Sequence, residues 1–203
     1  MRTADDVARE LGNMKGALMK AGQLISFVVE ALPEPAQQSL ASLYSDAPPM
    51  SSALAAGVVT AELGRSPESL FLDWDPVPAA AASIGQVHRA VTRDGREVAV
   101  KVQYPGVGAA IEADLSNADL LYRMVASFTL KGLDTRALVD ELRVRMRDEL
   151  DYTLEAANIL EFRRHFAGHP FVSLPALVAE HSGRTVLTTE WVDGLSWARF
   201  VEQ

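Results

Sequence analysis

Residues 79–104 read AAAASIGQVHRAVTRDGREVAVKVQY, and this stretch decides the fold of the chain. Two extended runs, 84–91 and 97–103, flank an Asp94-Gly95 pair. Asp-Gly between alternating apolar residues predicts a β-hairpin, because glycine readily takes the positive φ angle of a tight turn. In the second run three valines alternate with smaller or polar residues, namely Val98, Val100 and Val102. Lys101 is therefore expected on the strand face opposite these valines.

Very small residues precede the hairpin at positions 79–83, and Gly85 follows them. A backbone with so few side-chain atoms can approach a ligand closely. Protein kinases hold ATP between a glycine-rich loop that covers the phosphates and a strand-borne lysine that pairs with them. The loop positions of that pattern fall here on Ala80, Ala82, Gly85 and Val87, and Val98-Ala99-Val100-Lys101 stands where kinases carry Val-Ala-Ile-Lys. The alternative is an alanine-rich helix followed by an ordinary hairpin whose lysine faces solvent.

The composition limits the class of protein. With 203 residues and 48% hydrophobic residues, the chain can bury a sizeable core. A net charge of −8 argues against non-specific binding to nucleic acid. The absence of cysteine excludes disulfides and thiolate metal sites and fits a reducing compartment. No secretory signal and no transmembrane segment is visible, so we expect a cytoplasmic protein, with peripheral attachment to a membrane left open.

The first 78 residues are expected to form a helical extension. Apolar residues recur at helical spacing over residues 3–31, which include Lys20-Ala21-Gly22-Gln23. On local evidence Lys20 and Gln23 belong to a solvated helix face. Ser51 or Ser52 is expected to cap a further helix that ends before Gly64. Residues 66–78, which contain three prolines, are predicted to be a surface connection into the hairpin.

Two helices are expected after the hairpin, over residues 107–128 and from Asp134 or Thr135 to Phe166. The second carries Glu149-Leu150-Asp151 and, further on, Glu155. In a regular helix Asp151 and Glu155 share a face, because they are four residues apart. Glu149 and Asp151 lie about 200° apart around a regular helix and cannot point into one cavity without a distortion. The alternative is a charged, solvated helix face.

The end of the chain returns to strand at residues 185–191. Residues 171–178 form an edge strand at best, since Pro175 interrupts them. Glu190-Trp191-Val192-Asp193-Gly194 then leads into a helix that starts at about Ser196. A kinase N-lobe has such a connector after its fifth strand, and the connector's backbone receives the adenine. The alternative is an ordinary strand-to-helix turn.

With these pieces in order, the sequence closely resembles the UbiB/AarF family of atypical kinase-like proteins. The family's K-x-G-Q motif stands at Lys20-Ala21-Gly22-Gln23, its alanine-rich loop at Ala80-Ala81-Ala82-Ser83 and its E-x-D motif at Glu149-Leu150-Asp151. The strings SIGQVHRA, VAVKVQYPG and DYTLEAANI are similar to the family as well. The resemblance covers essentially the whole chain. It implies an α+β fold in which residues 1–78 are a helical extension and residues 79–203 a kinase-like N-lobe, an antiparallel sheet with a long helix, without a C-lobe.

The resemblance also implies roles for individual residues. Lys101 would pair with the nucleotide phosphates and with Glu155, and Lys20 and Gln23 would cover the pocket and meet Glu149 or Asp151. The implied nucleotide-binding positions are Ala80, Ala81, Ala82, Ser83, Gly85, Val87, Lys101, Glu190 and Val192. The cofactors would be ATP or ADP with Mg²⁺, whose ligands are expected in the C-lobe and not in this chain.

The family's implied role is support of quinone or lipid metabolism, including ubiquinone biosynthesis, with ATPase activity as its biochemical description. In the family the lid over the pocket takes the room of a protein substrate, and the resemblance therefore implies ATP hydrolysis or a transferase acting on lipids or small molecules. Expected partners are the nucleotide and lipid or quinone-pathway proteins. Kinases also need a catalytic-loop Asp and Asn and a D-F-G Asp, and no such motif is present here. We therefore expect a truncated part of a longer protein, catalytically incomplete as it stands.

A different class of function remains open, namely a non-catalytic regulatory or scaffold module that binds a partner through the helical extension and needs no nucleotide. A dinucleotide-binding Rossmann fold is a poor fit. In that fold the small-residue loop opens a helix within a βαβ unit, whereas here it enters an antiparallel hairpin.

Overall fold

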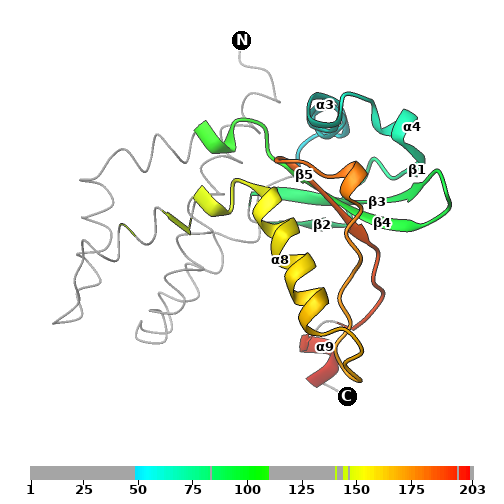
Figure 1. Cartoon of the computed structure of the whole chain (residues 1–203). Coiled ribbons are helices and arrows are strands. Elements are labelled where there is room, and N and C mark those ends of the chain that lie inside the picture. The colour runs from blue at the N-terminus through cyan, green and yellow to red at the C-terminus, as the bar shows by residue number, and fades with distance from the viewer. Residues whose placement is uncertain are drawn as a thin grey trace, which may run out of the picture.

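The computed structural model describes residues 49–82, 84–109, 140, 144–145, 147–195 and 197–201. The predicted helix over residues 3–31, the motif containing Lys20 and Gln23, and most of the predicted helix over residues 107–128 lie outside the described residues. Five strands of the described part form one antiparallel sheet, with helices against it (Figure 1). The predicted α+β class is confirmed. Of the described helices, none is both long enough and apolar enough to cross a bilayer.

The hairpin predicted from the Asp-Gly turn forms the centre of the sheet. Strand β3 (Gly85–Thr92) pairs with strand β4 (Glu97–Gln103) in a continuous antiparallel register from Gly85 opposite Gln103 to Val91 opposite Glu97. Gly95 has a φ of +86°, which a residue with a side chain rarely adopts, and its N–H donates to the carbonyl of Thr92 at 2.9 Å. The three alternating valines of β4 are fully buried.

Strand β3 has neighbours on both sides. Strand β1 (Phe71–Trp74) pairs with its C-terminal end and strand β2 (Ala80–Ala81) with its N-terminal half, while β5 (Val186–Glu190) pairs with β4. The predicted surface connection over residues 66–78 is therefore wrong. It contains helix α4 (Pro67–Leu70) and β1, and Phe71 is buried in the core. Pro67 begins α4, where its missing N–H costs nothing, so this proline starts a helix instead of breaking one.

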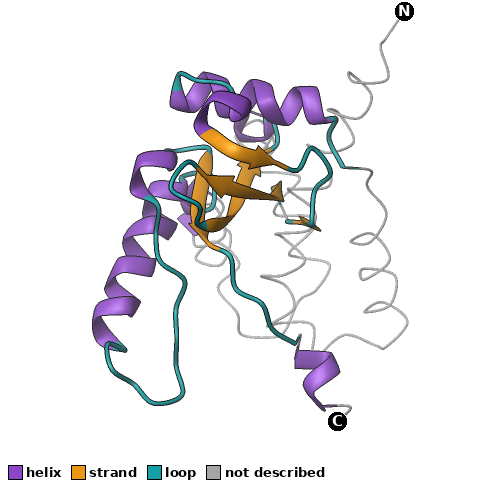
Figure 2. Cartoon of the chain, turned by 90° about the vertical axis from the view of Figure 1, so that its right-hand side faces the viewer, coloured by secondary structure: helices purple, strands orange, loops and turns teal. Residues whose placement is uncertain are grey.

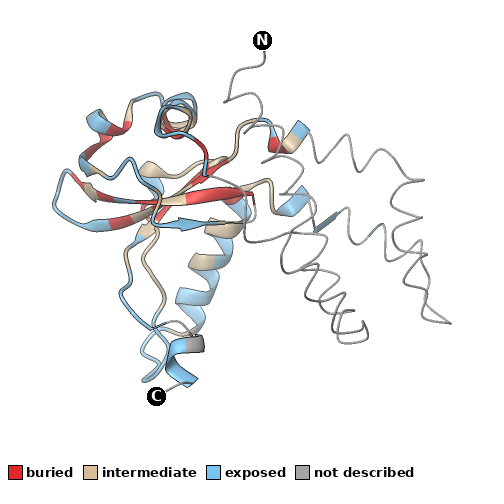
Figure 3. Cartoon of the chain, turned by 180° about the vertical axis from the view of Figure 1, so that it is seen from behind, coloured by how far each residue is buried: buried red, intermediate tan, exposed pale blue. Residues whose placement is uncertain are grey.

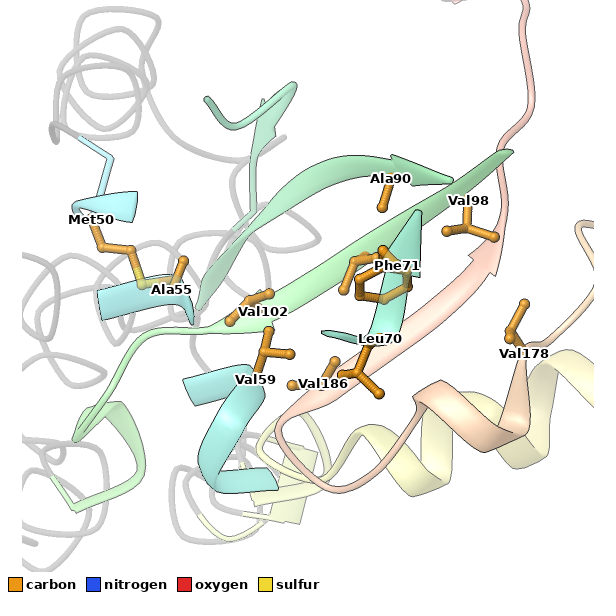
Figure 4. Packing of buried hydrophobic residues seen from close by; sticks show 11 residues of the cluster. Met50, Ala55, Val59, Leu70, Phe71, Ala90, Val98, Val102, Val178 and Val186 are labelled. Carbon is orange, nitrogen blue, oxygen red and sulfur yellow. The ribbon is translucent and has the colours of Figure 1, made fainter. Parts of the chain in front are cut away.

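Helix α3 (Ser52–Leu63) covers the valine face of the sheet. The side chain of Ser51 caps it by accepting the N–H of Leu54 at 3.4 Å, and Gly64, with a φ of 71°, ends it, as predicted. Its buried residues pack with the sheet in a core around Phe71 (Figure 4). The core consists of Met50, Ala55, Val59, Leu70, Phe71, Ala90, Val98, Val100, Val102, Val178 and Val186.

A buried polar network lies at one end of this core. The His88 ring is fully buried and stacks on Trp74 with centroids 4.6 Å apart. Its Nδ1 donates to the carbonyl of Asp75 at 2.8 Å, and its Nε2 accepts from Gln86 at 2.8 Å. Gln86 in turn accepts the N–H of Met50 at 2.9 Å. This arrangement requires a neutral imidazole, and burial lowers the pKa of His88 below its usual value.

Helix α8 (Tyr152–His165) lies on the other side of the sheet from α3 (Figures 1 and 2). Most of its surface is exposed (Figure 3). The prediction of one continuous helix through Glu149 and Asp151 is wrong, because the chain forms a turn at 149–150 and Asp151 is extended, with φ −123° and ψ 95°. Asp151 is the N-cap of α8, so it does not share a helix face with Glu155. An aspartate side chain that accepts a nearby backbone N–H competes with the continuing helix and starts a new one.

The remaining described elements follow α8 in sequence. Residues 171–178 make a single bridge, from Leu177 to Thr189, which agrees with the expectation of an edge strand at best. The short helix η1 (Ala179–His181) leads into β5, and the chain then passes through the connector into α9 (Trp197–Val201) (Figure 2). The strand and helix expected at the end of the sequence are both confirmed.

Candidate functional site

Lys101 lies on the sheet face opposite the core. The strand registers place Ala80 opposite Val87, and Val87 opposite Lys101. Residues directly opposite each other in antiparallel strands share a face, so these three form a row across β2, β3 and β4. Ala80 of the alanine-rich stretch and Lys101, 21 positions apart in the chain, are thereby brought to one surface of the sheet.

Lys101 forms an ion pair with α8. Its Nζ lies 2.6 Å from Oε2 of Glu155, and the side chains are 23% and 43% exposed. The ammonium also lies 4.5 Å from the centroid of the Tyr152 ring, a cation–π distance. The carboxylate and the ring together hold the ammonium at one position. The structure thus brings together the two residues that the family resemblance paired, and it adds Tyr152 to them.

Tyr152 and Gly85 are packed closely beneath the small-residue loop. The Tyr152 hydroxyl is buried and has no hydrogen-bond partner among the described residues. Burial, first of all, and then the nearby carboxylates of Glu155 and Glu149 raise its pKa. A Cβ on Gly85 would lie 2.3 Å from the carbonyl oxygen of Val102 and 3.0 Å from the Tyr152 hydroxyl. The missing side chain of Gly85 therefore permits a close approach within the protein, and its predicted contact with nucleotide stays a prediction.

A cleft of about 610 Å³ lies between Lys101 and the N-terminal part of α8. Its lining contains two cationic side chains, Lys101 and Arg145, and four carboxylates, Asp148, Glu149, Asp151 and Glu155. Such an acidic surface repels a free polyphosphate, and a divalent cation bound to the polyphosphate lowers that repulsion. The described residues contain no group of three or more side chains that could hold a metal ion by themselves. The charge of the cleft therefore disfavours a free polyphosphate more than one that carries a divalent cation.

The two acidic residues of the E-x-D motif reach the same cleft because the helix is broken between them. Glu149 lies in the turn and Asp151 at the cap, and both line the cleft. Asp151 accepts the N–H of Thr153 at 3.0 Å and lies 3.4 Å from Nε of Arg184. Hydrogen bonds from Thr153, first of all, and the charge of Arg184 lower the pKa of Asp151. The distortion that the spacing required is present in the structure.

The connector after β5 is only partly available to a ligand. The N–H of Glu190 donates to Ala176 at 2.8 Å, and its carboxylate accepts the N–H of the same residue at 3.2 Å. The N–H of Trp191 donates to Glu97 at 3.0 Å. Val192 lies beyond these contacts and is 64% exposed. The exposed Val192 is not among the residues that line the cleft beside Lys101, and its adenine contact stays a prediction.

The other residues predicted to bind nucleotide in the alanine-rich loop do not all lie on the Lys101 face of the sheet. Ala81 pairs with Gln86, so it lies on the opposite sheet face from Ala80. The N–H of Ala82 donates to the carbonyl of Gly85 at 2.8 Å and closes the turn, while Ser83 lies outside the described residues. Sequence reasoning missed Tyr152, although it stands three residues before Glu155 and therefore shares its helix face.

The chain was compared with known proteins. The model of the family described as the ABC1 atypical kinase-like domain matches residues 42–201. The chain is 36% identical over 192 residues to the Arabidopsis thaliana protein ACTIVITY OF BC1 COMPLEX KINASE 1, chloroplastic. This match covers 91% of this chain and 28% of that protein. It is 37% identical over 180 residues to the probable protein kinase UbiB of Aeromonas hydrophila, covering 87% of this chain and 33% of that protein.

The solved structure of Rv3197 in complex with erythromycin, from Mycobacterium tuberculosis, is also similar. It has 39% sequence identity and a TM-score of 0.65, and the match covers 98% of this chain and 50% of that one. The chain thus spans half of this structural relative and a third or less of the two curated relatives. The described sheet and helices have the kinase-like architecture that the sequence predicted.

Proposed function

Because this chain belongs to the family of ABC1 atypical kinase-like domains, we propose that it is the ATP-binding lobe of a UbiB-like atypical kinase or ATPase. The observation that carries the proposal is the ion pair between Lys101 and Glu155. It lies on the sheet face that also carries Ala80 and Val87, and beside an open cleft. A lysine fixed by a helix-borne glutamate is how kinases present a cation to nucleotide phosphates.

The proposed binding mode assigns a part to each group. The Lys101 ammonium donates to the phosphates, and Glu155 holds it in position. Val87 offers apolar surface next to the lysine, and the backbone of Glu190 and Val192 contacts the adenine. Mg²⁺ bound with the nucleotide neutralises phosphate charge near the acidic side chains of the cleft. A base for phosphoryl transfer is not assigned among these residues, so the proposal for this chain is nucleotide binding.

The proposed biological role is support of quinone or lipid metabolism, as the resemblance to the UbiB/AarF family implies. The proposal includes a lipid or a small molecule as the phosphate acceptor of a kinase reaction. It also includes proteins of the lipid or quinone pathway as partners. The whole relatives are two to four times longer than this chain, so their activities enter here as proposals only.

The competing proposal is a scaffold module that needs no nucleotide. The two proposals differ in the effect of MgATP or MgADP on thermal unfolding. A ligand at one hundred times its dissociation constant stabilises the folded state by about 2.7 kcal/mol. For a chain of this size each kcal/mol raises the unfolding temperature by about 2–4 °C. ATP binding therefore predicts a rise of several degrees, larger with Mg²⁺ than with EDTA.

The decisive variant is Lys101→Ala, with Arg93→Ala as the control. Arg93 lies in the turn of the same hairpin, donates to the carbonyl of Glu68, and does not line the cleft, so the control removes the same charge from the same hairpin. We expect Lys101→Ala to lose the nucleotide-dependent rise and Arg93→Ala to keep it. An equal nucleotide-dependent rise in unfolding temperature in both variants would show that Lys101 does not contribute to binding. No such rise in the unmodified chain would favour the scaffold module.

A further inference from the structure

The carboxylate of Glu62, in the last turn of α3, binds a turn that lies far away in sequence. Its Oε1 accepts the N–H of Arg184 at 2.5 Å, and its Oε2 accepts the hydroxyl of Thr185 at 2.7 Å. Hydrogen bonds to an ionised carboxylate are stronger than those between neutral groups. Because one carboxylate makes two of them, it fixes both the position and the orientation of the turn at residues 183–185.

The turn is shaped around this carboxylate. A Cβ on Gly183 would lie 2.2 Å from Oε1 of Glu62 and 2.9 Å from its Cδ, so only glycine leaves room for the side chain in its present position. The N–H of Gly183 donates to the carbonyl of Val186 at 2.7 Å, which closes the turn tightly before β5. The contact with Glu62 is therefore built into the conformation of the turn.

The same turn holds the first residues of α8. The carbonyl of Arg184 accepts the N–H of Tyr152, the first residue of the helix, at 2.9 Å. The Arg184 side chain lies 3.4 Å from Asp151, the N-cap. One helical turn later Glu155 makes its ion pair with Lys101. An unbroken series of contacts therefore leads from α3, on the core side of the sheet, to the ion pair on the opposite side.

We propose that Glu62 is a positioning residue of the nucleotide site, which holds the N-terminus of α8 through the turn at 183–185 and so keeps Glu155 against Lys101. The nucleotide part of this inference rests on the proposed function. A displacement of the last turn of α3 is then transmitted to the ion pair and changes nucleotide affinity. The competing explanation is that Glu62 only fastens α3 to the fold.

The first test needs no nucleotide. Hydrogen exchange of the amides at residues 152–158 is measured in the full chain for the unmodified protein, Glu62→Ala, Glu62→Gln and Glu68→Ala. Glu68 is an exposed glutamate in the neighbouring helix α4 and serves as the matched control. We expect exchange about tenfold faster in Glu62→Ala, an intermediate rate in Glu62→Gln, which keeps one acceptor, and an unchanged rate in Glu68→Ala.

A second variant reaches the same contact from the other side. In Gly183→Ala the new methyl group displaces the Glu62 carboxylate, so it must accelerate the same amides while Glu62 itself is intact. If Glu62→Ala lowers the unfolding temperature but leaves exchange at 152–158 at the rate of the unmodified chain, the contact only fastens α3 and the inference is overturned.

The second test measures MgATP affinity. We expect the dissociation constant to rise about three- to tenfold in Glu62→Ala. The same substitution should have no further effect in a Glu155→Gln background, because the ion pair through which Glu62 acts is already lost. An equal effect in both backgrounds refutes the inference. If the unmodified chain does not bind MgATP, the proposed function fails, and the exchange measurement still decides the role of Glu62.

Discussion

The substitution Gly85→Ala tests the close approach of strands β3 and β4. Its Cβ would lie 2.3 Å from the carbonyl oxygen of Val102, and real Cβ atoms essentially never come within 3.0 Å of such an atom. The oxygen belongs to backbone in the centre of the sheet, so it cannot turn aside as a flexible side chain would. Gly85 also pairs with Gln103 at the end of the hairpin. The two strands must therefore separate locally.

The magnitude follows from two opposing contributions. Forcing an extra methyl group into a packed interior costs about 1–3 kcal/mol. Replacing glycine by alanine also restricts the unfolded chain, which offsets about 0.4–1 kcal/mol of that cost. We expect a net loss of about 1–2 kcal/mol in the free energy of unfolding, measured by urea denaturation. The corresponding fall in unfolding temperature is about 2–8 °C.

The matched control is Gly57→Ala in the exposed middle of α3, where nothing lies within 4 Å of the added Cβ. Here alanine should stabilise the protein by about 0.5–1 kcal/mol, because glycine is the poorer helix former. Adding Tyr152→Phe to Gly85→Ala should recover only a small part of the loss, since the Val102 oxygen remains. If Gly85→Ala is as stable as the unmodified chain while Gly57→Ala is more stable, the argument from the close approach is refuted.

Two further predictions concern pH and helix capping. Burial depresses the pKa of His88 below its usual value of 6.5, so the unfolded chain binds the proton first as the pH falls. The free energy of unfolding should be highest above pH 6.5 and decline below it. Urea denaturation between about pH 7.5 and 5.5 should show a smaller decline in His88→Asn than in the unmodified chain. Equal declines in the two proteins would assign the pH dependence to another group. Asp151→Ala should lower the free energy of unfolding by about 1 kcal/mol through loss of the α8 cap. Asp151→Asn should retain most of the free energy of unfolding, because asparagine also caps helices. Equal losses in both variants would count against capping as the cause.

The hairpin and α3 were predictable because their signals are local. Asp94-Gly95 takes a conformation that glycine permits, and Ser51 and Gly64 mark the ends of α3 through contacts within a few residues. The alternation of valines around Lys101 set the two faces of β4, since side chains of a strand alternate whatever the strand packs against. Each of these features depends on neighbours in sequence.

The errors fell where distant residues decide. Residues 66–78 have the prolines of a loop, but β1 forms because Phe71 finds a place in a core made by β4, β5 and α3. The helix break at Asp151 has a capping residue as its signal, and the Arg184 turn that receives the N–H of Tyr152 lies more than thirty residues away. Periodicity alone could not distinguish this break from a continuous helix, because the apolar and charged residues on both sides fit helical spacing.

The sequence by itself determined the order of elements, the hairpin with its lysine and the family to which the chain belongs. The family resemblance implied the pairing of Lys101 with Glu155, and the structure gives it a distance of 2.6 Å. Only the tertiary structure decided that Tyr152 packs under both Lys101 and Gly85, and that Glu62 binds the turn at 183–185. The physical reason is that dihedral preferences and side-chain alternation are set by adjacent residues, whereas an ion pair or a buried ring contact is set by how whole elements pack. In this protein those packing contacts make up the candidate site.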